Sequence, residues 1–239
     1  MSGTWMHSGF LPNYIHRLPH ILCLHGYRQN SQTFREKTGA FRKIIKNKAK
    51  LVFITAPNIV PPLESEEGAA DTPISSDQRG WWFSRPDDYF RAQDITDCDK
   101  GFRESVDVVC KCFKEEGPFD GVLGFSQGAS FLSLLCAIKE QDTDSPIQFD
   151  FAIVVAGFKS RSSDHQDLYR NKVSCPSLHV YGETDGVIPK DMSEELANDQ
   201  FIEPTILQHP GGHFIPASSA QKKVYLDFLN KMMQMKNSL

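Results

Sequence analysis

The fold of this 239-residue chain is decided by the stretch Phe119-Asp120-Gly121-Val122-Leu123-Gly124-Phe125-Ser126-Gln127-Gly128-Ala129. A short apolar run leads to Ser126, glycines stand two positions to either side, and helix-forming residues continue to Ile138. Strand, sharp turn and helix are the context in which Gly-x-Ser-x-Gly forms a nucleophile elbow. The turn strains the serine backbone, and side chains at Gly124 and Gly128 would collide with the neighbouring strand and helix. The stretch therefore predicts a serine hydroxyl presented at the top of the sheet, where its strand ends, and at the N-terminus of a helix.

The length and composition fit one globular domain. A single α/β domain commonly reaches about 250 residues, and 40% hydrophobic residues are enough to form a core. The net charge is −4, and the densest group of cations, within residues 42–50, is interrupted by Ile44 and Ile45. That pattern is typical of the solvated face of a helix, so we expect no nucleic-acid binding.

Cysteine usage and the N-terminus indicate the compartment. The six cysteines are scattered without a Cys-x-x-Cys pair, so we expect free thiols, with neither a metal site nor a cofactor. The first residues lack the basic and apolar regions of a signal peptide. No segment approaches the ~18 consecutive apolar residues of a membrane span, so we expect no stable membrane insertion. The cytoplasm is the default location, and no feature of the sequence indicates an oligomeric state.

Apolar runs alternate with helical spacing along the chain. We expect an irregular N-terminal arm over residues 1–17 and a single domain over residues 18–239. The expected strands are 20–24, 51–54, 121–124, 151–156, 177–181 and 205–209, and the expected helices are 33–46, 92–116, 129–138, 192–199 and 220–233. This alternation predicts an α/β-hydrolase fold, with a predominantly parallel central sheet, helices on both faces and no large cap domain. Ligands of such sheets bind beyond the carboxyl ends of the strands.

A serine nucleophile needs a base and a residue that orients the base. In the α/β-hydrolase arrangement these residues follow in the order Ser, Asp or Glu, His, each after a strand. Ser126, Asp185 and His213 occur in that order, after three separate expected strands. We therefore expect them to form a catalytic triad.

Other acids and histidines compete for the last two positions. Glu183 lies closer to the strand end than Asp185, and Asp191 resembles an N-terminal residue of the next helix. His179 falls inside a strand, and His209 ends the strand before the glycine-rich turn. Asp185 and His213 have the more suitable positions, in turns that directly follow strands.

An oxyanion requires two backbone donors. One is expected to be the amide of Gln127, directly after the nucleophile, and the other the amide of Tyr27, in the loop after the first strand. The alternative is that this loop is an ordinary strand–helix turn.

The irregular segment 58–90 contains the aromatic group Arg79-Gly80-Trp81-Trp82-Phe83. Aromatic side chains bury a large apolar area, so Trp81, Trp82 and Phe83 could wall a groove for an acyl chain. Under this interpretation, Trp82→Ala would slow the turnover of long-chain esters more than that of acetate esters. The alternative is that the rings fill the core beneath a long loop. Further candidate substrate contacts are His25, Phe158 and Phe214, and residues 60–78 could close over the site.

Five motifs together resemble those of the FSH serine hydrolase family, and they are Phe34-Arg35-Glu36-Lys37-Thr38-Gly39-Ala40, Arg79-Gly80-Trp81-Trp82-Phe83, Gly117-Pro118-Phe119-Asp120-Gly121, Gly124-Phe125-Ser126-Gln127-Gly128 and Gly212-His213-Phe214-Ile215-Pro216. The resemblance covers roughly residues 18–230. It implies a compact α/β-hydrolase fold, carboxylic-ester hydrolysis and, in one branch, a preference for long-chain alkyl or acyl esters. Ser126, Asp185 and His213 match the family's triad positions, whereas the arm over residues 1–17 is not part of the pattern.

The predicted function is therefore that of a serine esterase acting on a small-molecule ester or acyl substrate through an acyl-enzyme. An acyl thioesterase would use the same residues, so the sequence does not separate the two. A non-catalytic binding module is a further alternative, but the chain has kept all three triad residues.

Overall fold

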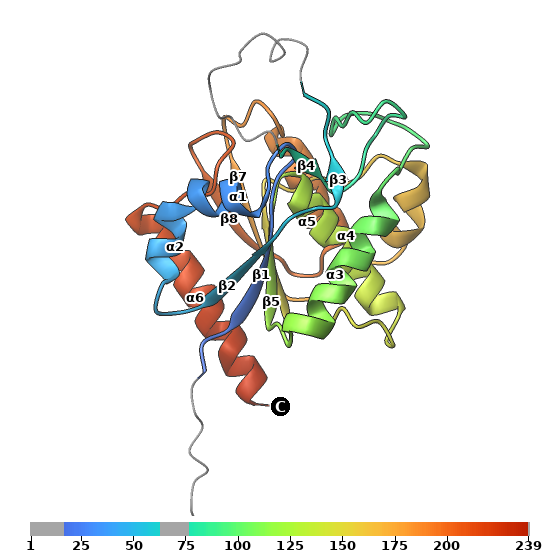
Figure 1. The fold of residues 1–239 in the computed structure, drawn as a ribbon. Helices are drawn as coiled ribbons and strands as arrows, with labels where there is room; N and C mark the ends of the chain where they lie inside the picture. The colour runs from blue at the N-terminus through green and yellow to red at the C-terminus, as the bar shows by residue number, and fades with distance from the viewer. Residues whose placement is uncertain (1–16, 63–76, 239) are drawn as a thin grey trace, which may run out of the picture.

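The computed structural model describes residues 17–62 and 77–238, which build a six-stranded sheet. Its order is β2-β1-β5-β6-β7-β8, and every pairing is parallel. The strands are β1 (His20–Leu24), β2 (Lys50–Ile54), β5 (Gly121–Phe125), β6 (Phe151–Val155), β7 (Ser177–Gly182) and β8 (Thr205–His209) (Figure 1). The predicted parallel sheet is thus confirmed. The arm expected over residues 1–17 lies, apart from Arg17, outside the described residues.

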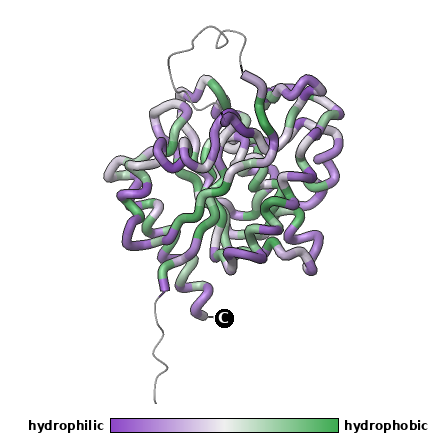
Figure 2. The backbone as a smooth tube through the Cα atoms, in the orientation of Figure 1, coloured by the Kyte–Doolittle hydropathy of each residue, from purple (hydrophilic) through white to green (hydrophobic). Residues whose placement is uncertain are grey.

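Helices cover both faces of the sheet. They are α1 (Ser31–Lys37), α2 (Gly39–Ile45), α3 (Phe102–Glu116), α4 (Gln127–Gln141), the 3-10 helix η2 (Ser163–Tyr169), α5 (Lys190–Gln200) and α6 (Ser219–Asn237). One core contains side chains of α3, α4, η2 and α5, and the opposite core contains those of α1, α2 and α6. Apolar residues concentrate in the central strands and in α4 (Figure 2). Residues 127–137 of α4 are all buried, so the helix that follows the predicted nucleophile is held on every side.

Two predicted helices differ from those observed. The helix expected over residues 33–46 is divided at Thr38, which ends α1 and precedes α2 while its hydroxyl donates to the Phe34 carbonyl. The helix expected over residues 92–116 begins only at Phe102. Gly101 precedes it with a φ of 87°, which does not continue a right-handed helix, and Ile95 is 84% exposed rather than packed. The small sheet of β3 (Asn58–Ile59) and β4 (Arg79–Gly80), and η2, were not predicted.

A buried carboxylate bonds both ends of the described chain to the start of β5, the strand that leads to Ser126. The Asp120 side chain is fully buried directly before β5, and it accepts two hydrogen bonds of 2.7 Å from the Arg17 guanidinium. It also accepts from the His20 amide at 2.7 Å and from Lys236 Nζ at 2.6 Å. Burial alone would raise the pKa of Asp120, but the bonds from Lys236, His20 and Arg17 outweigh it and hold the pKa below its usual range.

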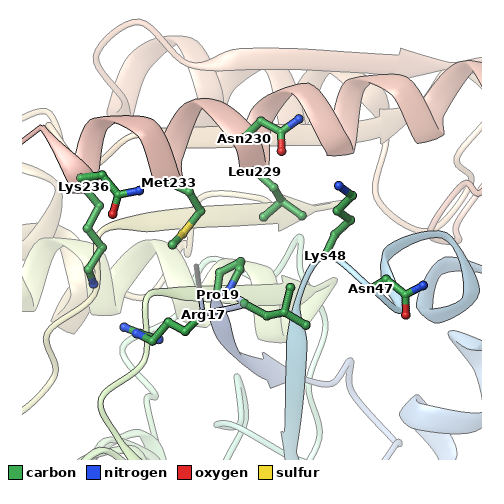
Figure 3. A pocket seen from close by; sticks show the side chains of 10 residues that line it. Arg17, Pro19, Asn47, Lys48, Leu229, Asn230, Met233 and Lys236 are labelled. Carbon is green, nitrogen blue, oxygen red and sulfur yellow. The ribbon is translucent and has the colours of Figure 1, made fainter. Parts of the chain in front are cut away.

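A hollow of about 370 Å³ lies beside this cluster (Figure 3). It is lined by Arg17, Pro19, Lys48 and Lys236, together with Leu229 and Met233 on the inner face of α6. Arg17 and Lys236 therefore approach each other from opposite ends of the sequence.

We expect Asp120→Asn to lower the free energy of unfolding at pH 7 by about 1–3 kcal/mol, because a neutral amide loses the charged hydrogen bonds. A folded-state pKa below the unfolded value gives stabilisation at neutral pH that is lost as the pH falls through the folded pKa. The difference between wild type and variant in urea unfolding should therefore shrink below about pH 4. Asp227→Asn is the control, since its pair with Lys223 is exposed and should contribute little. If the variant lost the same free energy of unfolding at pH 7 and at acid pH, the stabilisation would not come from the ionised Asp120 carboxylate.

Candidate active site

Ser126 occupies a strained turn between β5 and α4. Its φ of 54° and ψ of −118° lie outside the regions that serine normally adopts. The turn also requires close backbone contact, because a Cβ at Gly124 would lie 2.4 Å from the Gly128 carbonyl oxygen. A Cβ at Gly128 would lie 2.4 Å from the carbonyl oxygens of Leu24 and His25. The two glycines thus have the role that the sequence indicated.

The structure brings Ser126 into hydrogen-bond contact with His213. The distance from Ser126 Oγ to His213 Nε2 is 3.0 Å, and the distance from His213 Nδ1 to Asp185 Oδ2 is 2.7 Å. Since the Asp185 carboxylate accepts, we assign the imidazole proton to Nδ1, which leaves Nε2 free to accept from the serine hydroxyl. The His213 ring also packs on Phe125, with centroids 4.8 Å apart.

Asp185 is fixed by the turn that contains it. Its Oδ1 accepts from the amides of Val187 and Ile188 at 2.8 and 2.9 Å. Burial would raise the pKa of Asp185, but the bonds from His213 and from these amides lower it below its usual range. The carboxylate therefore stays ionised and oriented at neutral pH.

The competing residues have other contacts. Glu183 accepts from the Gln208 side chain at 2.8 Å, and Asp191 is exposed in the first turn of α5. Burial lowers the pKa of His179 to about 3, and its ring packs against Phe201. His209 accepts from the Gly211 amide and so holds the turn that carries His213.

The loop after β1 lies against the elbow. A Cβ at Gly26 would lie 3.4 Å from Ser126 Cβ and 3.2 Å from the Phe125 ring. Within residues 17–62 and 77–238, neither the Tyr27 amide nor the Gln127 amide donates a hydrogen bond to another group. The two predicted oxyanion donors thus lie on segments packed beside Ser126.

His25 is buried, and both of its ring nitrogens have partners. The Ala56 amide donates to Nε2 at 3.0 Å, so the proton is on Nδ1, which donates to the Gly26 carbonyl at 2.8 Å. Burial lowers the pKa of His25 to about 4, so the ring is neutral at physiological pH. These bonds agree with a packing role for His25 rather than with the expected substrate contact.

The aromatic group also occupies the core. Trp81 and Trp82 are 0% and 1% exposed, and Phe83 is buried. The Trp81 ring stacks on Phe131 at 4.9 Å, and the Trp82 ring meets Phe90 edge-on at 5.1 Å. The burial of all three side chains and the ring contacts of Trp81 and Trp82 agree with the alternative that this group fills the core, rather than with its interpretation as the wall of a groove.

The two remaining candidate contacts differ from each other. Phe158 is 1% exposed and packs near Phe90, so it too belongs to the core. Phe214 directly follows His213 and is 50% exposed, with its ring against His209. Of the five aromatic candidates, only Phe214 presents an open surface beside His213. The segment considered as a closing loop, residues 60–78, lies largely outside the described residues.

Sequence reasoning missed the side chain of Gln127. It is fully buried and binds the backbone of Trp81 and Trp82. A long polar side chain at the start of a largely apolar helix was the only available signal.

The described ranges contain no group of three or more His, Cys, Asp or Glu residues placed to hold a metal ion. None of their helices combines the length and apolarity needed to cross a bilayer.

Comparison with known proteins identifies the family. A profile described as serine hydrolase (FSH1) matches residues 15–225. The chain belongs to this family. The branch expected from the sequence is the one named for ovarian-cancer-associated protein 2, and curated relatives in Xenopus tropicalis and Homo sapiens are called esterase OVCA2. The frog protein is 49% identical over 91% of this chain and 94% of its own length, and the human protein 41% identical over 90% and 96%.

Solved structures confirm the α/β-hydrolase fold of this family member. SOBER1 of Arabidopsis thaliana matches with a TM-score of 0.57 and 17% identity, over 91% of this chain and 100% of its own. Acyl-protein thioesterase 2 of Zea mays matches with a TM-score of 0.58 and 18% identity, over 89% and 94%. At these identities the similarity concerns the fold alone.

Because the Trp82 ring is packed in the core, we expect Trp82→Ala to lower the free energy of unfolding by about 3–5 kcal/mol. Turnover of acetate and long-chain esters should fall together, in contrast to the groove interpretation. Urea unfolding and an ester series measure the two effects, and Trp82→Phe serves if the alanine variant does not fold. If the variant lost turnover of long-chain esters only and kept its stability, the interpretation of Trp82 as part of an acyl groove would be correct.

Proposed function

We propose that this chain is a serine carboxylic-ester hydrolase that acts through Ser126, Asp185 and His213. The observation that carries the proposal is the continuous series of hydrogen bonds from Asp185 through His213 to Ser126, of 2.7 and 3.0 Å. The relatives named as esterases support the same activity.

In the first half-reaction, His213 Nε2 removes the hydroxyl proton as Ser126 Oγ attacks the ester carbonyl carbon. Asp185 holds the imidazole in the required tautomer and stabilises the cation that forms. The amides of Tyr27 and Gln127 bind the oxyanion, and the N-terminus of α4 adds a favourable dipole. His213 then returns its proton to the leaving alcohol, and the acyl group stays on Ser126.

In the second half-reaction, a water molecule takes the place of the alcohol. His213 removes a proton from the water as its oxygen attacks the acyl carbon. When the second tetrahedral intermediate collapses, the bond to Ser126 Oγ breaks, His213 returns the proton to Oγ, and the acid is released. In both half-reactions the nucleophile, the base and the oxyanion donors come from the chain, and water is the second reactant.

The proposed substrates are long-chain alkyl or acyl esters. Two apolar side chains flank the triad at the surface, with Val187 55% exposed two residues after Asp185 and Phe214 50% exposed next to His213. Each methylene that they shield from water would contribute about 0.8 kcal/mol to binding.

We further propose a cytoplasmic location, in line with six free cysteines, and a single domain over residues 18–239.

Hydrolysis of p-nitrophenyl esters from acetate to myristate by wild type and Ser126→Ala tests the proposal. We expect activity to rise with chain length in the wild type and to fall by about 10⁴-fold or more in the variant, which lacks the nucleophile. Activity that survives the substitution would refute Ser126 as the nucleophile. Matched thioesters, measured in parallel, distinguish an esterase from a thioesterase.

Asp185→Asn tests the orienting residue. We expect kcat to fall by about 10³–10⁴-fold with little change in the melting temperature, because an amide donor in place of a carboxylate favours the wrong imidazole tautomer. Glu183→Gln is the matched control, since Glu183 lies two residues away and binds Gln208 instead. If Glu183→Gln lost more kcat than Asp185→Asn, Glu183 rather than Asp185 would be the residue that orients His213.

A further inference from the structure

The backbone segment Arg79–Trp82 runs between the loop after β1, which carries Tyr27, and the start of α4, which carries Gln127. On one side it pairs with the loop after β1: the Arg28 amide donates to the Arg79 carbonyl at 2.9 Å, and the Arg79 amide donates to the Gln29 carbonyl at 3.0 Å. Tyr27 lies directly before this pairing. Its ring covers Gly80, where a Cβ would come within 3.1 Å of it.

On the other side, the segment is held by the side chain of Gln127, directly after Ser126. The Trp81 amide donates to Gln127 Oε1 at 2.9 Å, and Gln127 Nε2 donates to the Trp82 carbonyl at 2.7 Å. The carboxamide is fully buried, so water does not compete for either bond. The residue whose main-chain amide is a proposed oxyanion donor thus also grips the segment with its side chain.

The Trp81 indole also contacts both the loop after β1 and helix α4. Its Nε1 donates to the His25 carbonyl at 2.7 Å, and its ring is stacked on Phe131 of α4. The segment also has hydrogen bonds to other elements, because the Trp81 carbonyl accepts from Ser105 Oγ of α3 and from Asn58 Nδ2 of β3. The loop after β1 and the start of α4 are therefore both bonded to the same fixed piece of backbone.

We propose that the Gln127 side chain and the Trp81 indole are positioning residues that set the distance between the Tyr27 and Gln127 amides. This role rests on the proposed function. An oxyanion hole requires donors about 2.7–3.1 Å from the developing charge, and a displacement of about 1 Å can cost 10²-fold in rate. The two amides lie on segments distant in sequence, and the Arg79–Trp82 segment is the structure that both segments bind.

The alternative is that the same bonds serve stability alone, as buried polar groups generally need partners. The two roles differ in what a substitution changes. Loss of stability lowers the melting temperature without changing the folded enzyme's affinity for a transition-state analogue. Loss of positioning lowers kcat and that affinity together and leaves KM nearly constant.

The test compares Trp81→Phe and Gln127→Met with two matched controls. Trp81→Phe removes the indole N–H but keeps a ring in place, and Gln127→Met keeps the length but removes both hydrogen bonds. Gln200→Met removes the hydrogen bond of another buried glutamine, whose Nε2 donates to the Asn171 carbonyl. Phe149→Leu removes a buried aromatic ring that packs on Phe113 of α3 and is not part of this arrangement. Gln127→Glu, which keeps an acceptor for the Trp81 amide, provides the conservative rescue.

The measurements are kcat, KM, the melting temperature and the inhibition constant of an alkyl trifluoromethyl ketone, which forms a tetrahedral oxyanion adduct with a serine nucleophile. We expect Trp81→Phe and Gln127→Met each to lower kcat and to weaken the ketone by about 10–100-fold, with KM changed by less than about threefold. Gln127→Glu should recover part of both. The two controls should lower the melting temperature with kcat and ketone affinity near the wild-type values.

Wild-type kcat and ketone affinity in Trp81→Phe and Gln127→Met would overturn the positioning role, whatever their melting temperatures. Equal losses in the two controls would overturn it as well, since they would show that destabilisation alone has this effect. If the wild type has no ester hydrolysis that depends on Ser126, the proposed function itself fails, and the positioning role fails with it.

Discussion

The strained turn at Ser126 is the constraint on which the rest of the structure depends. It is possible only because β1, β5 and α4 approach each other backbone to backbone, with no side chain at Gly124 or Gly128 to separate them. The strain is maintained because α4 is buried on every side and β5 lies between two parallel neighbours. The core thus stabilises a backbone conformation that serine would not adopt by itself.

A second close approach fixes the other two residues of the proposed triad. A Cβ at Gly182, the last residue of β7, would lie 2.1 Å from the Gly211 carbonyl oxygen in the turn after β8. The Glu183 amide also donates to the His209 carbonyl at 2.8 Å. The loops that carry Asp185 and His213 are therefore joined by their backbones, and the 2.7 Å contact of the two side chains follows from that junction.

Sequence reasoning predicted the parts of the site that depend on local patterns. Ser126, Asp185 and His213 each follow an expected strand, and strand ends are visible in a sequence. Trp81 and Trp82 were harder, because an aromatic residue in a long loop has the same appearance whether it faces a ligand or the core. The expected start of α3 at residue 92 was wrong, because Ile95 fits the helical spacing but is exposed and the helix begins only at Phe102. The role of the Gln127 side chain depends on partners about 45 positions away, which no local pattern contains.

The buried carboxylate of Asp120 has a topological consequence. It receives cations from Arg17 and Lys236, which lie near the two ends of the described chain, so these ends meet at the amino-terminal base of β5. Ser126 lies at the opposite end of the same strand. The described part of the chain is thus closed on itself by ion pairs, one strand length away from Ser126. A short peptide that links the residues near Arg17 to those near Lys236 would replace these ion pairs with a covalent connection. The chain could then begin and end at another surface turn without a change in the path of the sheet.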